Sequence, residues 1–164
     1  MECNQFAYLE VIKQQFNHFK ERAEEAIEQL TEQQLHWKPN EESHSIAIII
    51  QHLHGNMNSR WVDFFTSDGE KQTRKRGMEF IDQHFTKESL MARWHQGWEL
   101  LFNVINNLKE EDLVKTITIR NKSLSVLHAI QIEIAHISYH LGQMMYIGKQ
   151  IKNHDWKILS IPKG

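Results

Sequence analysis

Apolar residues recur every three or four positions along most of this chain, and this period constrains the fold more than any other feature. Only 7 Gly and 2 Pro occur among 164 residues, so few points force a helix to stop. The pattern therefore predicts an all-α chain with four long helices. The first two are expected at about residues 4–30 and about 45–65. The third is expected to begin after the capping residue Thr86 and to end near Leu108, and the fourth to begin after Ser123 or Ser125 as the cap and to end near Lys152.

Polar segments separate these predicted helices. Thr31-Glu-Gln-Gln34 has the pattern of a capping box that opens a short helical turn. Ser67-Asp-Gly69 ends the second helix, and the polar stretch up to Gln83 predicts a long connection that crosses over one end of a helix bundle. Residues 110–120 alternate between apolar and polar side chains, which predicts an extended segment or a small ribbon. The tail that ends in Ile161-Pro-Lys-Gly164 is expected to be a loop.

Length and charge favour one cytoplasmic domain that spans residues 1–164. A chain of this length can bury a single core without disulfides, and Cys3 has no second cysteine to pair with, which fits a reducing compartment. The net charge of −2 gives no basic field for nucleic acid, so the short basic run Lys71–Arg76 is expected to be a solvated loop. The N-terminus lacks the pattern of a signal peptide, and the apolar run Ile46–Ile50 is too short to cross a membrane.

His136 and His140 are the strongest sign of a functional site. They lie four residues apart in the last predicted helix, so both imidazoles occupy one helical face. Histidine is the commonest metal ligand, and the pair is therefore a candidate for half of a metal site. The alternative is that both side chains make core hydrogen bonds.

A mononuclear catalytic site typically has three protein ligands, so a third donor must come from another segment. The second predicted helix offers His52 and His54. These two side chains differ by about 200° around a helix and cannot both face the same point. Spacing alone leaves the choice between them open.

Two strings together resemble a known family. Gln51-His-Leu-His-Gly-Asn56 in the second predicted helix, with His136-x-x-x-His140-Leu-Gly-Gln143 in the last, is similar to the DinB superfamily (DinB/YfiT-like proteins), which includes bacillithiol-transferase-like proteins. The strings Gly55–Trp61 and Asp68-Gly-Glu-Lys71 are similar to one branch of it. The resemblance covers nearly the whole chain.

The resemblance implies a four-helix bundle in which one histidine of the second helix and two of the last bind a divalent metal ion near one end. The matching positions are His52, His136 and His140. Nickel or zinc is the expected metal, with iron or manganese as alternatives. His54 would then face outward or toward a partner.

The resemblance also implies a function: a metal-dependent transfer of a low-molecular-weight thiol to an electrophilic small molecule. The alternative is a non-enzymatic metal-binding or stress-response module, and a homodimer is a further option. Asn56, Gln143 and Glu133 are candidates for holding the histidine rings in place, although Glu133 could instead be a solvated surface charge. Tyr139 and Trp61 are candidates for lining a substrate pocket, or else for filling the core.

Overall fold

The computed structural model describes residues 7–161 and is mostly helical. Three parts of the sequence analysis fall outside the described residues: the predicted helical residues 4–6, Cys3 and the tail residues 162–164. The long helices are α1 (Ala7–Glu28), α3 (Ile46–Trp61), α4 (Lys87–Ile105) and α5 (Val126–Lys152). The shorter elements are α2 (Glu32–Leu35), the 3-10 helices η1 (Arg76–Phe80), η2 (Glu110–Asp112) and η3 (Asn153–Asp155), and the strands β1 (Thr116–Ile119) and β2 (Lys122–Ser125).

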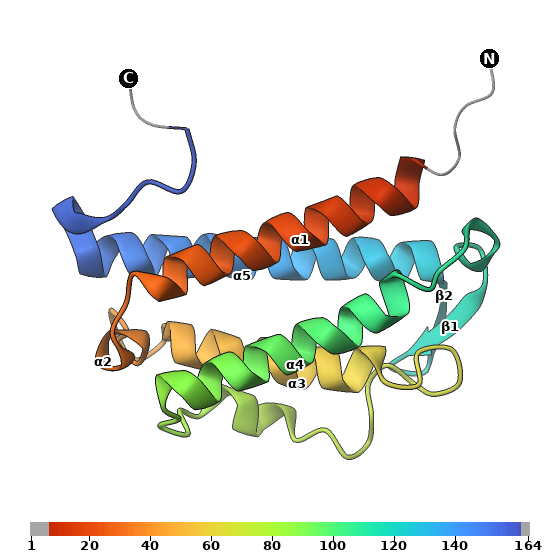
Figure 1. Cartoon of the computed structure of the whole chain (residues 1–164). Coiled ribbons are helices and arrows are strands. Elements are labelled where there is room, and N and C mark those ends of the chain that lie inside the picture. Colours follow the sequence, from red (N-terminus) through yellow and green to blue (C-terminus); the bar gives the residue numbers. More distant parts are fainter. Residues whose placement is uncertain (1–6, 162–164) are drawn as a thin grey trace.

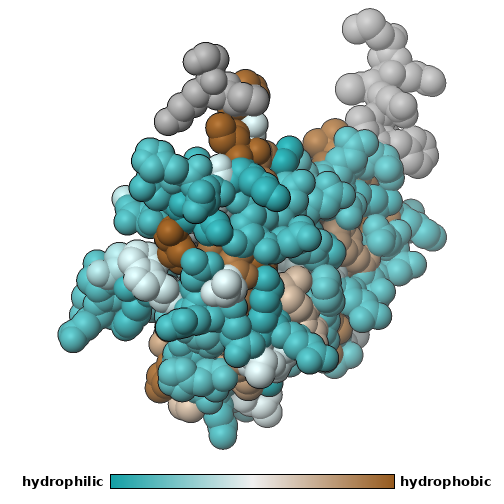
Figure 2. Space-filling model, turned by 60° about the vertical axis from the view of Figure 1, so that its left-hand side comes forward, coloured by the Kyte–Doolittle hydropathy of each residue, from teal (hydrophilic) through white to brown (hydrophobic). Residues whose placement is uncertain are grey.

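The four long helices lie side by side, with α1 along α5 and α3 along α4 (Figure 1). Each contributes one apolar face to a shared interior, which includes Phe16, Leu53, Trp98 and Ile137. Figure 2 shows a face of the molecule that is mostly hydrophilic, with separate small hydrophobic areas. Within residues 7–161, none of the helices combines the length and the hydropathy that a bilayer crossing requires.

Short polar side chains set the starts of the helices. Ser45, Thr86 and Ser125 each accept a hydrogen bond from the backbone N–H three residues later. Ser125 is thus the cap of α5, and Ser123 lies within β2, which pairs antiparallel with β1 in the predicted ribbon. The capping box predicted at Thr31 and Gln34 is present.

The predicted second helix was too long at its C-terminal end. Helix α3 stops at Trp61 rather than near residue 65, because Val62 is extended and Asp63 has a positive φ of 51°. The predicted third helix was also too long, since α4 ends at Ile105. The long connection that follows α3 is not only a loop, because η1 forms within it and packs against α3.

The Asp68–Lys71 segment attaches this connection to α3 and to the hairpin. Lys71 Nζ donates to the carbonyl oxygens of Ser59 (2.7 Å), Val62 (2.8 Å) and Asp68 (3.1 Å), and so satisfies backbone groups at the end of α3. Asp68 accepts the backbone N–H groups of Arg120 (2.8 Å) and Asn121 (2.7 Å) in the β1–β2 turn. These bonds give the Asp-Gly-Glu-Lys string a structural role.

Replacing Lys71 by methionine is expected to lower the free energy of unfolding by about 2 kcal/mol, because three backbone acceptors lose a charged donor. Urea unfolding of the two proteins would measure the change. Lys75→Met is the matched control, since Lys75 is exposed and makes no such contacts. An equal loss in both variants would contradict the role given to Lys71.

Candidate metal centre

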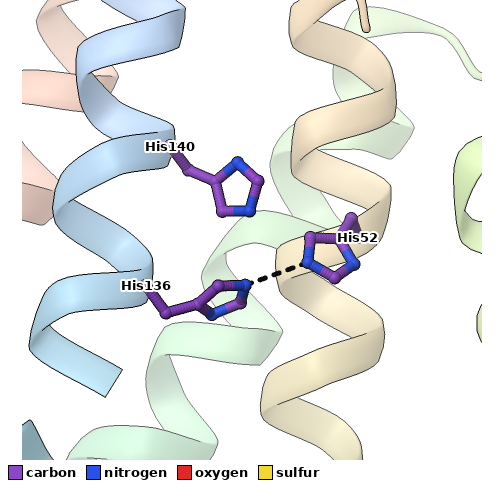
Figure 3. Close-up of side chains that lie close together, drawn as sticks. All are labelled: His52, His136 and His140. Carbon is purple, nitrogen blue, oxygen red and sulfur yellow. Dashed lines mark hydrogen bonds between the residues drawn. The ribbon is translucent and has the colours of Figure 1, made fainter. Parts of the chain in front are cut away.

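Three histidine side chains converge between α3 and α5 (Figure 3). His52 comes from α3. His136 and His140 come from consecutive turns of α5 and lie on one face of that helix, as their four-residue spacing predicted. Each offers a ring nitrogen, and the three atoms lie within 4.8 Å of one another. The Nε2 atoms of His52 and His136 are 3.0 Å apart.

The second histidine of α3 does not join this cluster. His54 Nε2 bonds to Gln96 Oε1 on α4 at 2.9 Å. The side chain is half-buried beside α4 and lies outside the cluster, and its orientation toward a partner stays a prediction. His52 and His54 therefore point in different directions from α3, as the separation of about 200° around a helix predicted, and His52 is the one beside His136 and His140.

The opposite ring nitrogens are held by polar side chains. His52 Nδ1 bonds to Glu79 Oε2 (2.9 Å), and His140 Nδ1 bonds to Gln143 Oε1 (2.9 Å). Since both partners are acceptors, these Nδ1 atoms carry the proton and the Nε2 atoms keep a free lone pair. His136 Nδ1 lies 3.6 Å from Glu133 Oε1, which is longer than a hydrogen bond.

The free lone pairs make the cluster suited to a cation. The unprotonated Nε2 of His52 lies 3.0 Å from His136 Nε2, and the buried His140 Nε2 has no hydrogen-bond partner among the described residues. A proton shared by His52 and His136 would still leave His140 without a partner. Imidazoles that bind one zinc ion at 2.0–2.1 Å have nitrogens roughly 3.3 Å apart, close to the separation seen here. The three histidines could therefore hold a metal ion.

Burial keeps His52 and His140 neutral. Burial, followed by repulsion from His136 and His52, lowers the pKa of His140 to about 3. Burial also lowers the pKa of His52, although the hydrogen bond that His52 donates to Glu79 opposes this effect. Neutral imidazole is the form that binds a metal, so these two side chains are in the ligand form at pH 7.

A carboxylate network fixes His52 from the side of the long connection. Arg74 donates to Glu79 through Nε and Nη2, both at 2.7 Å, and so holds the carboxylate that bonds His52. Gly55 makes room for this group, because a Cβ atom there would overlap the Glu79 carboxyl. Sequence reasoning missed Glu79 and Arg74, since both lie in a segment that was predicted to be loop.

A second carboxylate lies beneath His136. Glu133 is fully buried and accepts a hydrogen bond from Arg60 Nη1 at 3.0 Å, so the alternative that it is a solvated surface charge is wrong. Asn56, with its amide nitrogen turned toward Glu133, donates to both carboxylate oxygens at 3.0 and 3.2 Å. Burial would raise the pKa of Glu133, but His136 and Arg60 more than offset this, and its pKa lies below the usual value.

A pocket of about 420 Å³ opens beside the cluster, and its wall includes His52 and His136. Tyr139 also lines this pocket, as predicted, and is 55% exposed. Trp61 does not, because it is buried and its ring stacks on Phe64 at 4.9 Å. Trp61 is therefore a core residue.

His36, Asp82 and His84 form another group of potential ligands among the described residues. Both ring nitrogens of His36 already have acceptors, Asp82 Oδ2 at 2.7 Å and the carbonyl oxygen of Phe85 at 2.9 Å. This group therefore ties the connection to the segment after α2, and both ring nitrogens of His36 already have a protein neighbour.

Comparison with known proteins identifies the family. A family model described as "Protein of unknown function (DUF1572)" matches residues 4–164. A search of curated proteins gave no match. The matched family is DinB-like, in agreement with the coarser part of the resemblance in the sequence. Because the match spans nearly all of the sequence, the chain belongs to the DUF1572 family.

Proposed function

We propose that His52, His136 and His140 bind one divalent metal ion through their Nε2 atoms, and that the protein is a metal-dependent enzyme. The observation that carries this proposal is the convergence of three imidazoles, two of which burial keeps neutral, with no protein partner for the buried Nε2 of His140 among the described residues. The same family resemblance suggests nickel or zinc. Four long helices around one interior support the proposed four-helix bundle of the DinB superfamily.

The proposed reaction transfers a low-molecular-weight thiol to an electrophilic small molecule. A divalent ion held by three neutral imidazoles keeps its full charge, so it would favour the thiolate form of a thiol bound there. Glu79 and Gln143 would keep the histidine rings oriented by holding their Nδ1 protons. Tyr139, at the exposed side of the pocket, would contact the electrophile.

A purely structural role for the metal is the second candidate. The ligands come from both α3 and α5, so a bound ion would join these two helices and raise stability. Conjugation of a small thiol by the metal-loaded protein, but not by the metal-free protein, would favour the enzyme over this candidate.

Protein purified without a histidine tag is expected to contain about one metal ion per chain, and the triple variant His52→Ala/His136→Ala/His140→Ala is expected to contain none. Elemental analysis after dialysis measures both. His54→Ala is the matched control, because this histidine lies on the same helix but bonds to Gln96. Stoichiometric metal in the folded triple variant would overturn the proposed site.

A further inference from the structure

The wall of the pocket beside the three histidines is unusually basic. Arg60, Arg74, Arg76 and Arg120 all line it, and no aspartate or glutamate is among the described lining residues. Three of these arginines form ion pairs: Arg60 with Glu133, Arg74 with Glu70 and Glu79, and Arg120 with Glu70 through Nε alone. Arg76 and the terminal nitrogens of Arg120 are therefore the groups that can bind a ligand.

Arg76 is held close to the histidine cluster by stacking. Its guanidinium carbon lies 5.0 Å above the ring of Phe80, which in turn stacks on His52 with ring centroids 4.7 Å apart. These two distances put the Arg76 guanidinium no more than about 10 Å from the His52 ring. Arg76 has no ion-pair partner within residues 7–161.

Arg120 approaches the pocket from the β1–β2 turn. Its backbone is fixed there by a positive φ of 54° and by the bond from its N–H to Asp68 Oδ1. Only its Nε has a partner in the described part of the chain, Glu70 Oε2 at 3.2 Å, and the side chain is 61% exposed. Its two terminal nitrogens are therefore available as a fork of donors.

Charge counting also favours an anion. The four arginines face three carboxylates, Glu70, Glu79 and Glu133, which leaves one positive charge before any metal binds. A divalent ion on three neutral histidines would add two more. Guanidinium groups with free terminal nitrogens pair well with planar or tetrahedral oxyanions.

We propose that the pocket takes a small molecule with an oxyanion group, a carboxylate or a phosphate, which Arg76 and Arg120 bind while its other end reaches the metal centre. This inference rests on the proposed metal site and names the class of its substrate. The cavity of about 420 Å³ is large enough for such a molecule. Ile132 and Tyr139 lie in the same wall and offer contacts to its apolar part.

Three thiols of equal length and different charge test the proposal: 6-mercaptohexanoate, 6-mercaptohexanol and 6-aminohexanethiol. Each is titrated into cobalt-loaded protein, and the thiolate-to-metal charge-transfer absorption reports binding. We expect 6-mercaptohexanoate to bind on the order of tenfold more tightly than 6-mercaptohexanol, and 6-aminohexanethiol to bind most weakly. Competition by succinate and by inorganic phosphate then shows which oxyanion the pocket prefers.

The variant Arg76→Gln/Arg120→Gln is expected to bind cobalt normally but to lose the preference for 6-mercaptohexanoate. Arg22→Gln/Lys149→Gln removes the same charge from a half-buried and an exposed position, neither of which lines the pocket, and should keep the preference. Equal affinities of the wild-type protein for the three thiols would overturn the oxyanion site alone. Absence of a charge-transfer band with every thiol would overturn the proposed function as well.

Discussion

Replacing Arg60 by methionine is expected to lower the free energy of unfolding by about 3–5 kcal/mol, because it leaves a buried carboxylate without its cation. Arg60 is 6% exposed and Glu133 is 0% exposed, so the carboxylate that loses its guanidinium partner is poorly solvated. Asn56 would be the remaining strong donor to Glu133, and an amide dipole stabilises a buried charge less than a guanidinium does.

The double variant Arg60→Met/Glu133→Gln separates this ion pair from simple packing. It removes both charges and is expected to be more stable than Arg60→Met alone, since no unpaired charge remains buried. Urea unfolding of the metal-free wild-type protein, the two single variants Arg60→Met and Glu133→Gln, and the double variant measures the free energy of unfolding of each. The control is Arg22→Met, which breaks an exposed pair with Glu25 and should cost less than about 1 kcal/mol. A loss of free energy of unfolding of less than about 1 kcal/mol for Arg60→Met would contradict the role given to the buried ion pair.

The long helices could be predicted from the sequence because their apolar residues repeat with the helical period, and that period records which face is buried. The same argument located His136 and His140 on one face of α5. Helix ends were less predictable. Backbone geometry at Val62 and Asp63 ends α3, and no break in the apolar pattern marks that point.

The surroundings of the histidines could be predicted only in part. Glu133 lies three residues before His136, so helical spacing placed the two on one side of α5. Its burial depends on Arg60 of α3, and that contact is tertiary. From spacing alone, His52 and His54 were equally good candidates, and the family resemblance was needed to choose between them.

Glu79 and Arg74 could not have been found from periodicity, because side-chain directions in a connection follow its path through space. That path is set by Lys71 at the end of α3 and by Asp68 at the hairpin turn. Such contacts join residues that are far apart in the sequence. The two arginines of the proposed oxyanion site, Arg76 and Arg120, meet at the pocket for the same reason.

The metal-free protein is expected to become less stable as the pH falls below 6.5, and His140 should account for about 3 kcal/mol of that loss by pH 4. The pKa of His140 is 6.5 in the unfolded chain and about 3 in the folded protein. Below pH 6.5 the unfolded state therefore takes up a proton that the folded state does not, which favours unfolding. Above that pH both states are neutral, and this group has no effect.

Comparison with His140→Gln isolates this contribution from other titrating groups. His140→Gln loses contacts at every pH, which lowers its free energy of unfolding relative to the wild-type protein. This difference should be about 3 kcal/mol smaller at pH 4 than at pH 7, because only the wild-type protein loses stability through His140 in acid. Urea unfolding at both pH values, with chelator present, measures the difference. For the control Gln14→Ala, which changes an exposed residue of α1 and removes no titrating group, the difference from wild type should not change with pH.

A difference for His140→Gln that stays constant between pH 7 and pH 4 would mean that His140 is protonated in the folded protein. That outcome would also weaken the case for a bound metal ion, because the low pKa of His140 and the free lone pair on its Nε2 have one physical cause. Burying three imidazoles side by side disfavours a proton on His140, and the same burial leaves its Nε2 lone pair without a donor among residues 7–161. The stability that the metal-free protein loses in acid through His140 is thus the cost of keeping this proposed metal ligand neutral.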